Sequence, residues 1–163
     1  MQKLAAMKDK IAQLPLEQQA ELLELMSELE DAENKVSAKD DFISFVNIMW
    51  PSFISGRHHK TMAEAFERVA KGELKRLIIN MPPRTLKSHC TSIAFPAWLL
   101  GRDPRIKILC LHASNALGRD LDEACFDLMS SSRYRAFFPS TRVTLKKNKI
   151  GTSFGGHRQF MPI

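Results

Sequence analysis

A lysine followed by a serine, Lys87-Ser88, ends a loop that begins with Pro82-Pro83-Arg84. Proteins bind phosphate groups with backbone N–H groups at the start of a helix, a lysine that reaches the outer phosphates and a hydroxyl that helps to hold Mg²⁺. Lys87 can supply the lysine that reaches the outer phosphates, and Ser88 can supply the hydroxyl that helps to hold Mg²⁺. Arg84 adds a planar guanidinium that can bind two phosphate oxygens at once. The loop therefore has the side chains needed to bind a nucleoside triphosphate.

The segments on either side of the loop are those that would hold it in place. Residues 77–80 form a short apolar run between charged residues and two prolines, which predicts a buried strand that ends where the prolines lack N–H donors. Ser88 begins a segment that can be helical as far as Phe95. Strand, tight loop and helix is the layout of a phosphate-binding loop, so we expect the amides of residues 84–89 to face the ligand.

The loop departs from the usual G-x-x-x-x-G-K-[ST], or Walker A, pattern. The two glycines of that pattern would stand at positions 81 and 86, where this chain has Met81 and Leu86. A Lys-Ser pair is common in proteins. Taken alone, the loop leaves two interpretations open: a phosphate site that functions without glycines, or a surface loop that carries a lysine.

Beyond the loop, the sequence resembles the large subunit of bacteriophage and prophage terminases, the ATP-driven motors that package DNA. Members of this family carry phosphate loops of the Pro-Pro-Arg-x-x-Lys-Ser type, some of them with leucine before the lysine. The resemblance extends from about Phe42 to the last residue. Besides the loop, the matching segments are Phe42-Ile43-Ser44-Phe45-Val46, Trp50-Pro51, Gly56-Arg57-His58-His59, Gly72-Glu73-Leu74-Lys75-Arg76, Phe95-Pro96-Ala97-Trp98-Leu99-Leu100-Gly101 and Tyr134-Arg135-Ala136-Phe137-Phe138-Pro139.

The resemblance implies an α/β fold of the P-loop NTPase type, with a parallel sheet flanked by helices and with ATP and Mg²⁺ as cofactors. Lys87 and Arg84 would be the catalytic residues, and Ser88 would be the Mg²⁺ ligand. His59 lies in a stretch that is near the nucleotide base in the family. The implied partners are double-stranded DNA, the small terminase subunit and the portal. The residues expected to contact the nucleotide are Pro83, Arg84, Thr85, Leu86, Lys87, Ser88, His89 and His59.

Hydrolysis of ATP also requires a strand that ends in an Asp to help hold Mg²⁺, with a Glu beside it to activate water. No apolar run of this chain ends in Asp-Asp or Asp-Glu, and Asp120, Asp122 and Glu123 fall on a predicted helix. In the family, the acidic strand and then the nuclease domain follow the point where this chain stops. We therefore expect the N-terminal part of a packaging ATPase that is not hydrolytically competent alone. The alternatives are a stand-alone nucleotide- or subunit-binding module, such as a remnant or decoy, and a helicase-like ATPase.

Bulk composition fits a globular protein in a reduced compartment. The chain has 163 residues, 44% of them apolar, and its three cysteines have no C-x-x-C spacing. Its apolar runs are shorter than a membrane span and its N-terminus lacks a signal-peptide core, which predicts a cytoplasmic protein without a membrane partner. Residues 1–40 carry 5 basic and 9 acidic side chains, whereas residues 41–163 carry 19 and 9. The basic part suits a polyanion, nucleotide or DNA.

These features predict two parts: a helical N-terminal arm, residues 1–40, and a partial, truncated P-loop ATPase domain, residues 41–163. In the arm we expect two helices around Pro15, the second over residues 16–34 with leucines at helical spacing, and then a polar hinge at 35–40. The second helix is either a docking arm for another subunit or packed on its own domain. Because a truncated sheet exposes an edge, we expect the chain to self-associate.

Further elements follow from apolar periodicity and from end signals. We expect helices at 42–50, at 57–71 before Gly72, and at 116–130 with Asn115 as the cap, a strand at 106–111, and a hairpin after 143. The basic turn 146–149 either contacts DNA or is a charged hairpin tip. Arg133 and Arg135 either face phosphates or are solvated. A metal site at His58-His59 is disfavoured, because adjacent helical residues point apart and no further ligand has suitable spacing.

Overall fold

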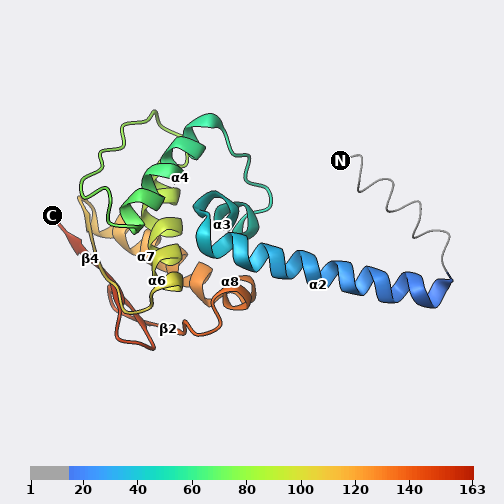
Figure 1. Cartoon of the computed structure of the whole chain (residues 1–163). Helices are drawn as coiled ribbons and strands as arrows, with labels where there is room; N and C mark the ends of the chain where they lie inside the picture. Colours follow the sequence, from blue (N-terminus) through green and yellow to red (C-terminus); the bar gives the residue numbers. More distant parts are fainter. Residues whose placement is uncertain (1–14) are drawn as a thin grey trace. The chain divides into compact units, whose positions relative to one another are not determined.

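The computed structural model describes residues 15–163, so the helix predicted before Pro15 lies outside the described residues. The chain divides into two units, Met1–Val36 and Ser37–Ile163. Helix α2 (Leu16–Asp40) begins in the first unit and ends in the second (Figure 1). The helix confirms the prediction for residues 16–34, but the polar hinge predicted at 35–40 is wrong. That segment has no glycine or proline, and the break falls at Asp41, which caps the following helix through the amide of Ser44.

The second unit has a helical layer built from three amphipathic or apolar segments. These are α3 (Phe42–Met49), α4 (Arg57–Ala70) and α6 (Phe95–Arg102). The ring of Phe42 lies at their centre, with its centroid 5.1 Å from Phe66 and 5.5 Å from Trp98 in edge-on contacts. Such pairs contribute about 1 kcal/mol each beyond the apolar area they bury. The sequence therefore predicted α3 and α4 correctly.

The sheet contains β1 (Lys107–His112), β2 (Val143–Lys146), β3 (Lys149–Thr152) and β4 (His157–Pro162), in the order β1-β4-β3-β2. Only β1 and β4 run parallel; the other two pairs are antiparallel. The α/β class is confirmed, but the sheet is mixed, whereas a parallel sheet was predicted. The short turns after β2 and β3 permit only antiparallel pairing, whereas the crossover from β1 to β4 is long enough for a parallel pair.

Helix α7 (Asn115–Ser130) covers one face of this sheet, and α8 (Ser132–Phe137) follows it (Figure 1). Gly118 lets α7 approach the sheet closely, because a Cβ there would lie 2.2 Å from a ring carbon of Phe160 on β4. The cap of α7 is Ser114, whose hydroxyl accepts from the amide of Leu117, and not Asn115 as predicted. Helix α7 therefore packs against β4, the strand that carries the buried Arg158.

The strand predicted at residues 77–80 does not form. Residues 75–83 have neither helical nor strand structure, and the side chain of Ile78 is 93% exposed. A strand needs a neighbour for its backbone groups, and no described strand pairs with this segment. Its apolar character therefore did not suffice to make it a strand. Among residues 15–163, no helix is long and apolar enough to cross a bilayer.

Candidate phosphate-binding site

The loop at residues 81–88 curls around the side chain of Lys87. The Lys87 ammonium donates to the carbonyl of Met81 at 2.9 Å and to that of Pro82 at 3.3 Å. The hydroxyl of Thr85 also donates to the Pro82 carbonyl, at 2.8 Å. The cation is thus held inside the loop by neutral acceptors, which is where a phosphate oxygen could replace them.

The backbone amides of the same loop, at residues 84–89, donate no hydrogen bond within the described residues. Leu86 has left-handed backbone angles, φ 56° and ψ 16°, and the helical residues begin directly after it at Lys87. Successive amides at such a junction converge into a concave site that favours anions. The arrangement has the donors that the sequence predicted for residues 84–89.

Leu86 stands where the usual pattern has its second glycine, and its backbone explains why glycine is usual there. A positive φ costs a non-glycine residue roughly 1–2 kcal/mol, and Arg84 also has a positive φ of 62°. The sequence pattern marked position 86 as a departure but did not reveal that the chain keeps the glycine-like backbone. The loop therefore maintains this conformation at the expense of local strain.

We expect Leu86→Gly to leave the free energy of unfolding unchanged or raise it by up to about 1 kcal/mol, because relief of strain offsets the lost side-chain contacts. The matched control is Leu117→Gly, since Leu117 has a similar exposure (51% against 48%) but lies in helix α7. The control should lower stability by about 1 kcal/mol. Urea denaturation of both variants measures the difference, and equal losses would contradict a strained Leu86.

His59 supports the loop from helix α4. Its Nδ1 accepts from the amide of Gly56 at 3.0 Å, so a neutral ring carries its proton on Nε2, which lies 3.0 Å from the carbonyl of Thr85. The side chain is buried, with 5% exposure. The expected divergence of adjacent histidines is wrong, because the rings of His58 and His59 are 3.9 Å apart. Both nitrogens of His59 are in use, which favours a role in holding the loop over one in binding a metal.

The helical segment after the loop is continuous but irregular. It runs through α5 (Lys87–His89), a π-helical turn η1 (Cys90–Ala94) and α6. The π-turn lies just before Pro96, which stands in the first turn of α6. The ring of His89 contacts that of Trp50, with centroids 4.3 Å apart, and burial lowers the pKa of the His89 imidazole. Trp50 therefore lies beside the helix that carries Lys87 and Ser88.

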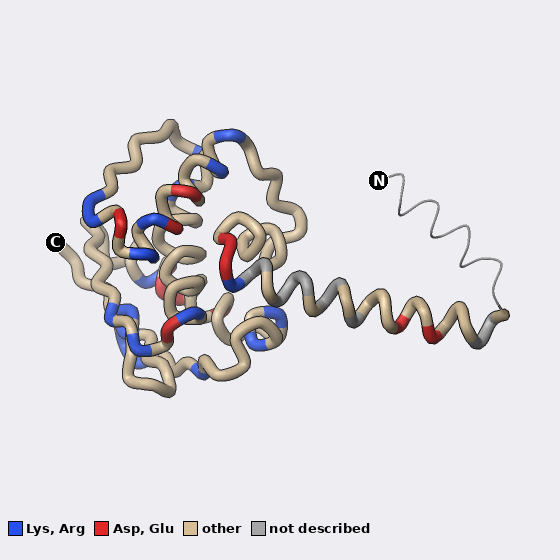
Figure 2. The backbone as a smooth tube through the Cα atoms, viewed as in Figure 1, with Lys and Arg blue, Asp and Glu red and all other residues tan. Residues whose placement is uncertain are grey.

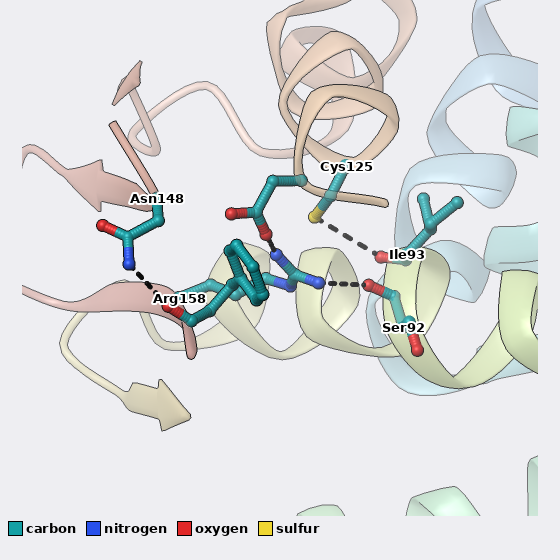
Figure 3. A network of polar contacts seen from close by, with 7 residues as sticks. Ser92, Ile93, Cys125, Asn148 and Arg158 are labelled. Atoms are coloured by element: carbon teal, nitrogen blue, oxygen red, sulfur yellow. Dashed lines mark hydrogen bonds and ion pairs between the residues drawn. The ribbon is translucent and has the colours of Figure 1, made fainter. Parts of the chain in front are cut away.

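An ion pair that the sequence did not predict lies under this helix (Figure 3). Arg158 on β4 pairs with Asp122 on α7, and the two residues are 0% and 3% exposed. The guanidinium also donates to the carbonyl of Ser92 in the π-turn, at 3.1 Å. Asp122 was correctly placed on a helix from the sequence, but an isolated Arg158 gave no signal of burial. A charged side chain is rarely buried unless it is paired, and here the carboxylate of Asp122 compensates the charge of Arg158.

Two other predicted features have a defined place. Arg133 donates to the carbonyl of Met49 at 3.1 Å and so caps the end of α3, whereas Arg135 is exposed.

A cavity of about 580 Å³ lies between α4 and residues 77–81, lined by Arg57, His58, Met62 and Met81 among others. The cavity adjoins the loop, because Met81 lines the cavity and its carbonyl also accepts from the Lys87 ammonium.

Among known proteins, the chain is similar to the terminase large subunit of Enterobacteria phage T3, with 33% identity over 76 residues. The aligned stretch makes up 47% of this chain and 13% of the phage protein, so the chain spans a small part of that relative. No family model matches the chain, and no solved structure gives a significant match. The similarity supports a terminase-like relationship and hints at a role in phage DNA packaging.

Proposed function

We propose that this chain is the ATP-binding part of a phage DNA-packaging motor of the terminase type, in which ATP hydrolysis drives double-stranded DNA into a capsid. The observation that carries the proposal is the run of unpaired amides at residues 84–89 in the loop whose carbonyls hold the Lys87 ammonium. The local similarity to a terminase large subunit gives this phosphate site its biological setting.

In the proposed complex, the phosphates replace the carbonyls of Met81 and Pro82 as partners of the Lys87 ammonium. The exchange is favourable because a charged acceptor binds an ammonium more strongly than a neutral carbonyl does. The exposed guanidinium of Arg84 would bind the outermost phosphate. His59 keeps Thr85 in place during the exchange, since its contact is with the backbone and not with the ligand.

Mg²⁺ is the proposed companion of the triphosphate. The exposed hydroxyl of Ser88 is the side-chain group of the loop that would bind the ion. No cluster of three His, Cys, Asp or Glu side chains suited to a metal occurs in residues 15–163. This donor set fits an ion held mainly by phosphate oxygens and water, which is usual for Mg²⁺. When bound, the ion would neutralise part of the phosphate charge.

The cavity beside α4 is the proposed site of the nucleoside. Its volume of about 580 Å³ is in the usual range for a small ligand. His58 and Arg57 have the flat side chains on which a base can stack, and Met62 and Met81 supply polarizable apolar walls. The proposal thus places the base on the α4 side of the loop and the triphosphate over residues 84–89.

DNA, the small terminase subunit and the portal are proposed partners of the complete motor, to which this chain would contribute its nucleotide site. Figure 2 shows basic positions throughout the second unit. Lys146, Lys147 and Lys149 lie at the β2–β3 hairpin. A basic surface favours a polyanion without selecting its sequence. We also propose self-association, because β1 has a described partner strand on one side only and exposes Leu109 and Leu111.

The test is a titration of the full chain with a non-hydrolysable ATP analogue and Mg²⁺, followed by calorimetry and by the fluorescence of Trp50. We expect saturable binding with affinity falling from ATP analogue to ADP to AMP, because the loop holds phosphates. A Trp50→Phe variant identifies the source of the fluorescence change. Absence of binding at millimolar nucleotide, or equal affinity for AMP and the ATP analogue, would contradict the proposal.

A further inference from the structure

We propose that Arg158 is a positioning residue for the phosphate site: from the sheet, it fixes the helical segment that presents Lys87 and Ser88. This inference rests on the proposed function, since it concerns the same site. It assigns a role to a residue that contacts neither the loop nor the expected ligand. Figure 3 draws the contact of Arg158 with Ser92.

The first step is a missing hydrogen bond in the helix. In an α-helix, the carbonyl of Ser92 would accept from the N–H of residue 96, but Pro96 has none. In the π-turn, the amide of Phe95 instead bonds to the carbonyl of Cys90, five residues back. The Ser92 carbonyl is therefore left without its usual backbone donor, at a half-buried position.

The second step is that Arg158 supplies the donor. Its Nη2 lies 3.1 Å from the Ser92 carbonyl, and its Nη1 pairs with the carboxylate of Asp122 on α7. The planar guanidinium offers several N–H donors in fixed directions, so one side chain can hold a strand, a helix and a π-turn together. A lysine at this position would have a single ammonium and could not keep both contacts in the same geometry.

The third step connects this contact to the loop. Ser92 lies four residues after Ser88 in the continuous segment of α5 and η1, and the hydroxyl of Thr91 donates to the carbonyl of Lys87 at 2.8 Å. A shift of the π-turn would consequently move the start of the helix and the amides before it. Phosphate binding depends on that placement, because donors displaced by about 1 Å lose much of their effect.

Other side chains hold the same segment from the opposite end or from other helices. Cys125 of α7 donates to the carbonyl of Ile93, and Tyr134 of α8 donates to that of Ala97 at 2.7 Å. In the described part of the chain, Arg158 is the side chain that links the π-turn to the sheet. It therefore transmits the position of β4 to the phosphate site.

The main test uses Arg158→Met combined with Asp122→Leu, which removes both buried charges together and preserves apolar packing. We expect this double variant to bind the ATP analogue roughly 10-fold more weakly than the wild type, as for other residues that orient ligand-binding groups. Adding Pro96→Ala restores an N–H four residues after Ser92 and should recover most of the affinity. Arg119→Met with Asp120→Leu, on the exposed face of α7, is the control and should bind as the wild type does.

Each outcome has a distinct meaning. If Lys87→Ala abolishes binding but the double variant binds like the wild type, Arg158 has no positioning role and the proposed function stands. If Pro96→Ala gives no recovery in the double variant, the missing Ser92 donor is not the cause and the inference is overturned. If the wild type itself does not bind nucleotide, both proposals fail. Should the double variant not fold, Arg158→Lys is the substitute: an affinity equal to the wild type would overturn the inference, and a weaker affinity at unchanged unfolding temperature would support it.

Discussion

Lys87→Ala is expected to weaken binding of the ATP analogue by roughly 10- to 100-fold, the loss typical of one buried charge-assisted interaction. The reason is that the Lys87 ammonium is held at the carbonyls of the loop, and the amides of residues 84–89 in the same loop donate no hydrogen bond within the described residues. The free energy of unfolding should change by less than about 1 kcal/mol, because the carbonyls that lose the ammonium can bond to water. Calorimetric titration and urea denaturation measure the two effects.

Lys60→Ala is the matched control for this variant. Lys60 is an exposed lysine on α4, so its removal changes the net charge by the same amount without touching the loop. The control should bind nucleotide within a factor of about two of the wild type, since exposed charges act weakly at a distance in salt. If both lysine variants bind equally, the attraction is a general charge effect and the assigned phosphate site is wrong.

Under the proposed function, the two contacts of Lys87 would also set the strength of phosphate binding. Its ammonium already has acceptors in Met81 and Pro82, so part of the affinity for phosphate is spent on their displacement. A glycine-rich loop would need no strained Leu86 and would move more freely between the two arrangements. We therefore expect the left-handed residues Arg84 and Leu86 to keep the amides of the loop free of backbone partners before a ligand binds.

Sequence reasoning succeeded where a local pattern determines the structure. The apolar run from Phe42 and the helix signals over residues 57–71 predicted two helices, and the rings of Phe42 and Phe66 pack between them. It failed where structure depends on a distant neighbour. Residues 77–80 have a strand-like composition, but a strand forms only with a pairing partner, and composition does not show whether one is present.

The site itself was partly predictable for the same reason. Lys87 and Ser88 are adjacent to the loop in the sequence, whereas Arg158 reaches Ser92 from 66 positions away. One clue was available, because Pro96 must leave a carbonyl unpaired four residues earlier. The identity of the donor was not readable, since several side chains of suitable chemistry follow Pro96 and only the packing of β4 against the helix selects one.

Asp122→Leu is expected to lower the free energy of unfolding by about 3–5 kcal/mol, because it leaves the guanidinium of Arg158 buried without a compensating charge. For a chain of this size the loss corresponds to a decrease of about 10 °C in unfolding temperature. Burial already lowers the pKa of the Arg158 guanidinium, which shows the direction of the desolvation penalty. Calorimetry or thermal denaturation followed by circular dichroism measures the change.

The double variant separates the charge effect from the loss of packing. With Arg158→Met added to Asp122→Leu, no charge stays buried, and stability should return to within about 2 kcal/mol of the wild type; the remainder is the unpaired Ser92 carbonyl. Asp120→Leu, an exposed position of the same helix, should alter stability by less than about 0.5 kcal/mol. A double variant as unstable as Asp122→Leu alone would mean that the carboxylate contributes through shape and not through charge. Under that outcome the ion pair would no longer explain why an arginine is tolerated beneath the helix that follows residues 81–88.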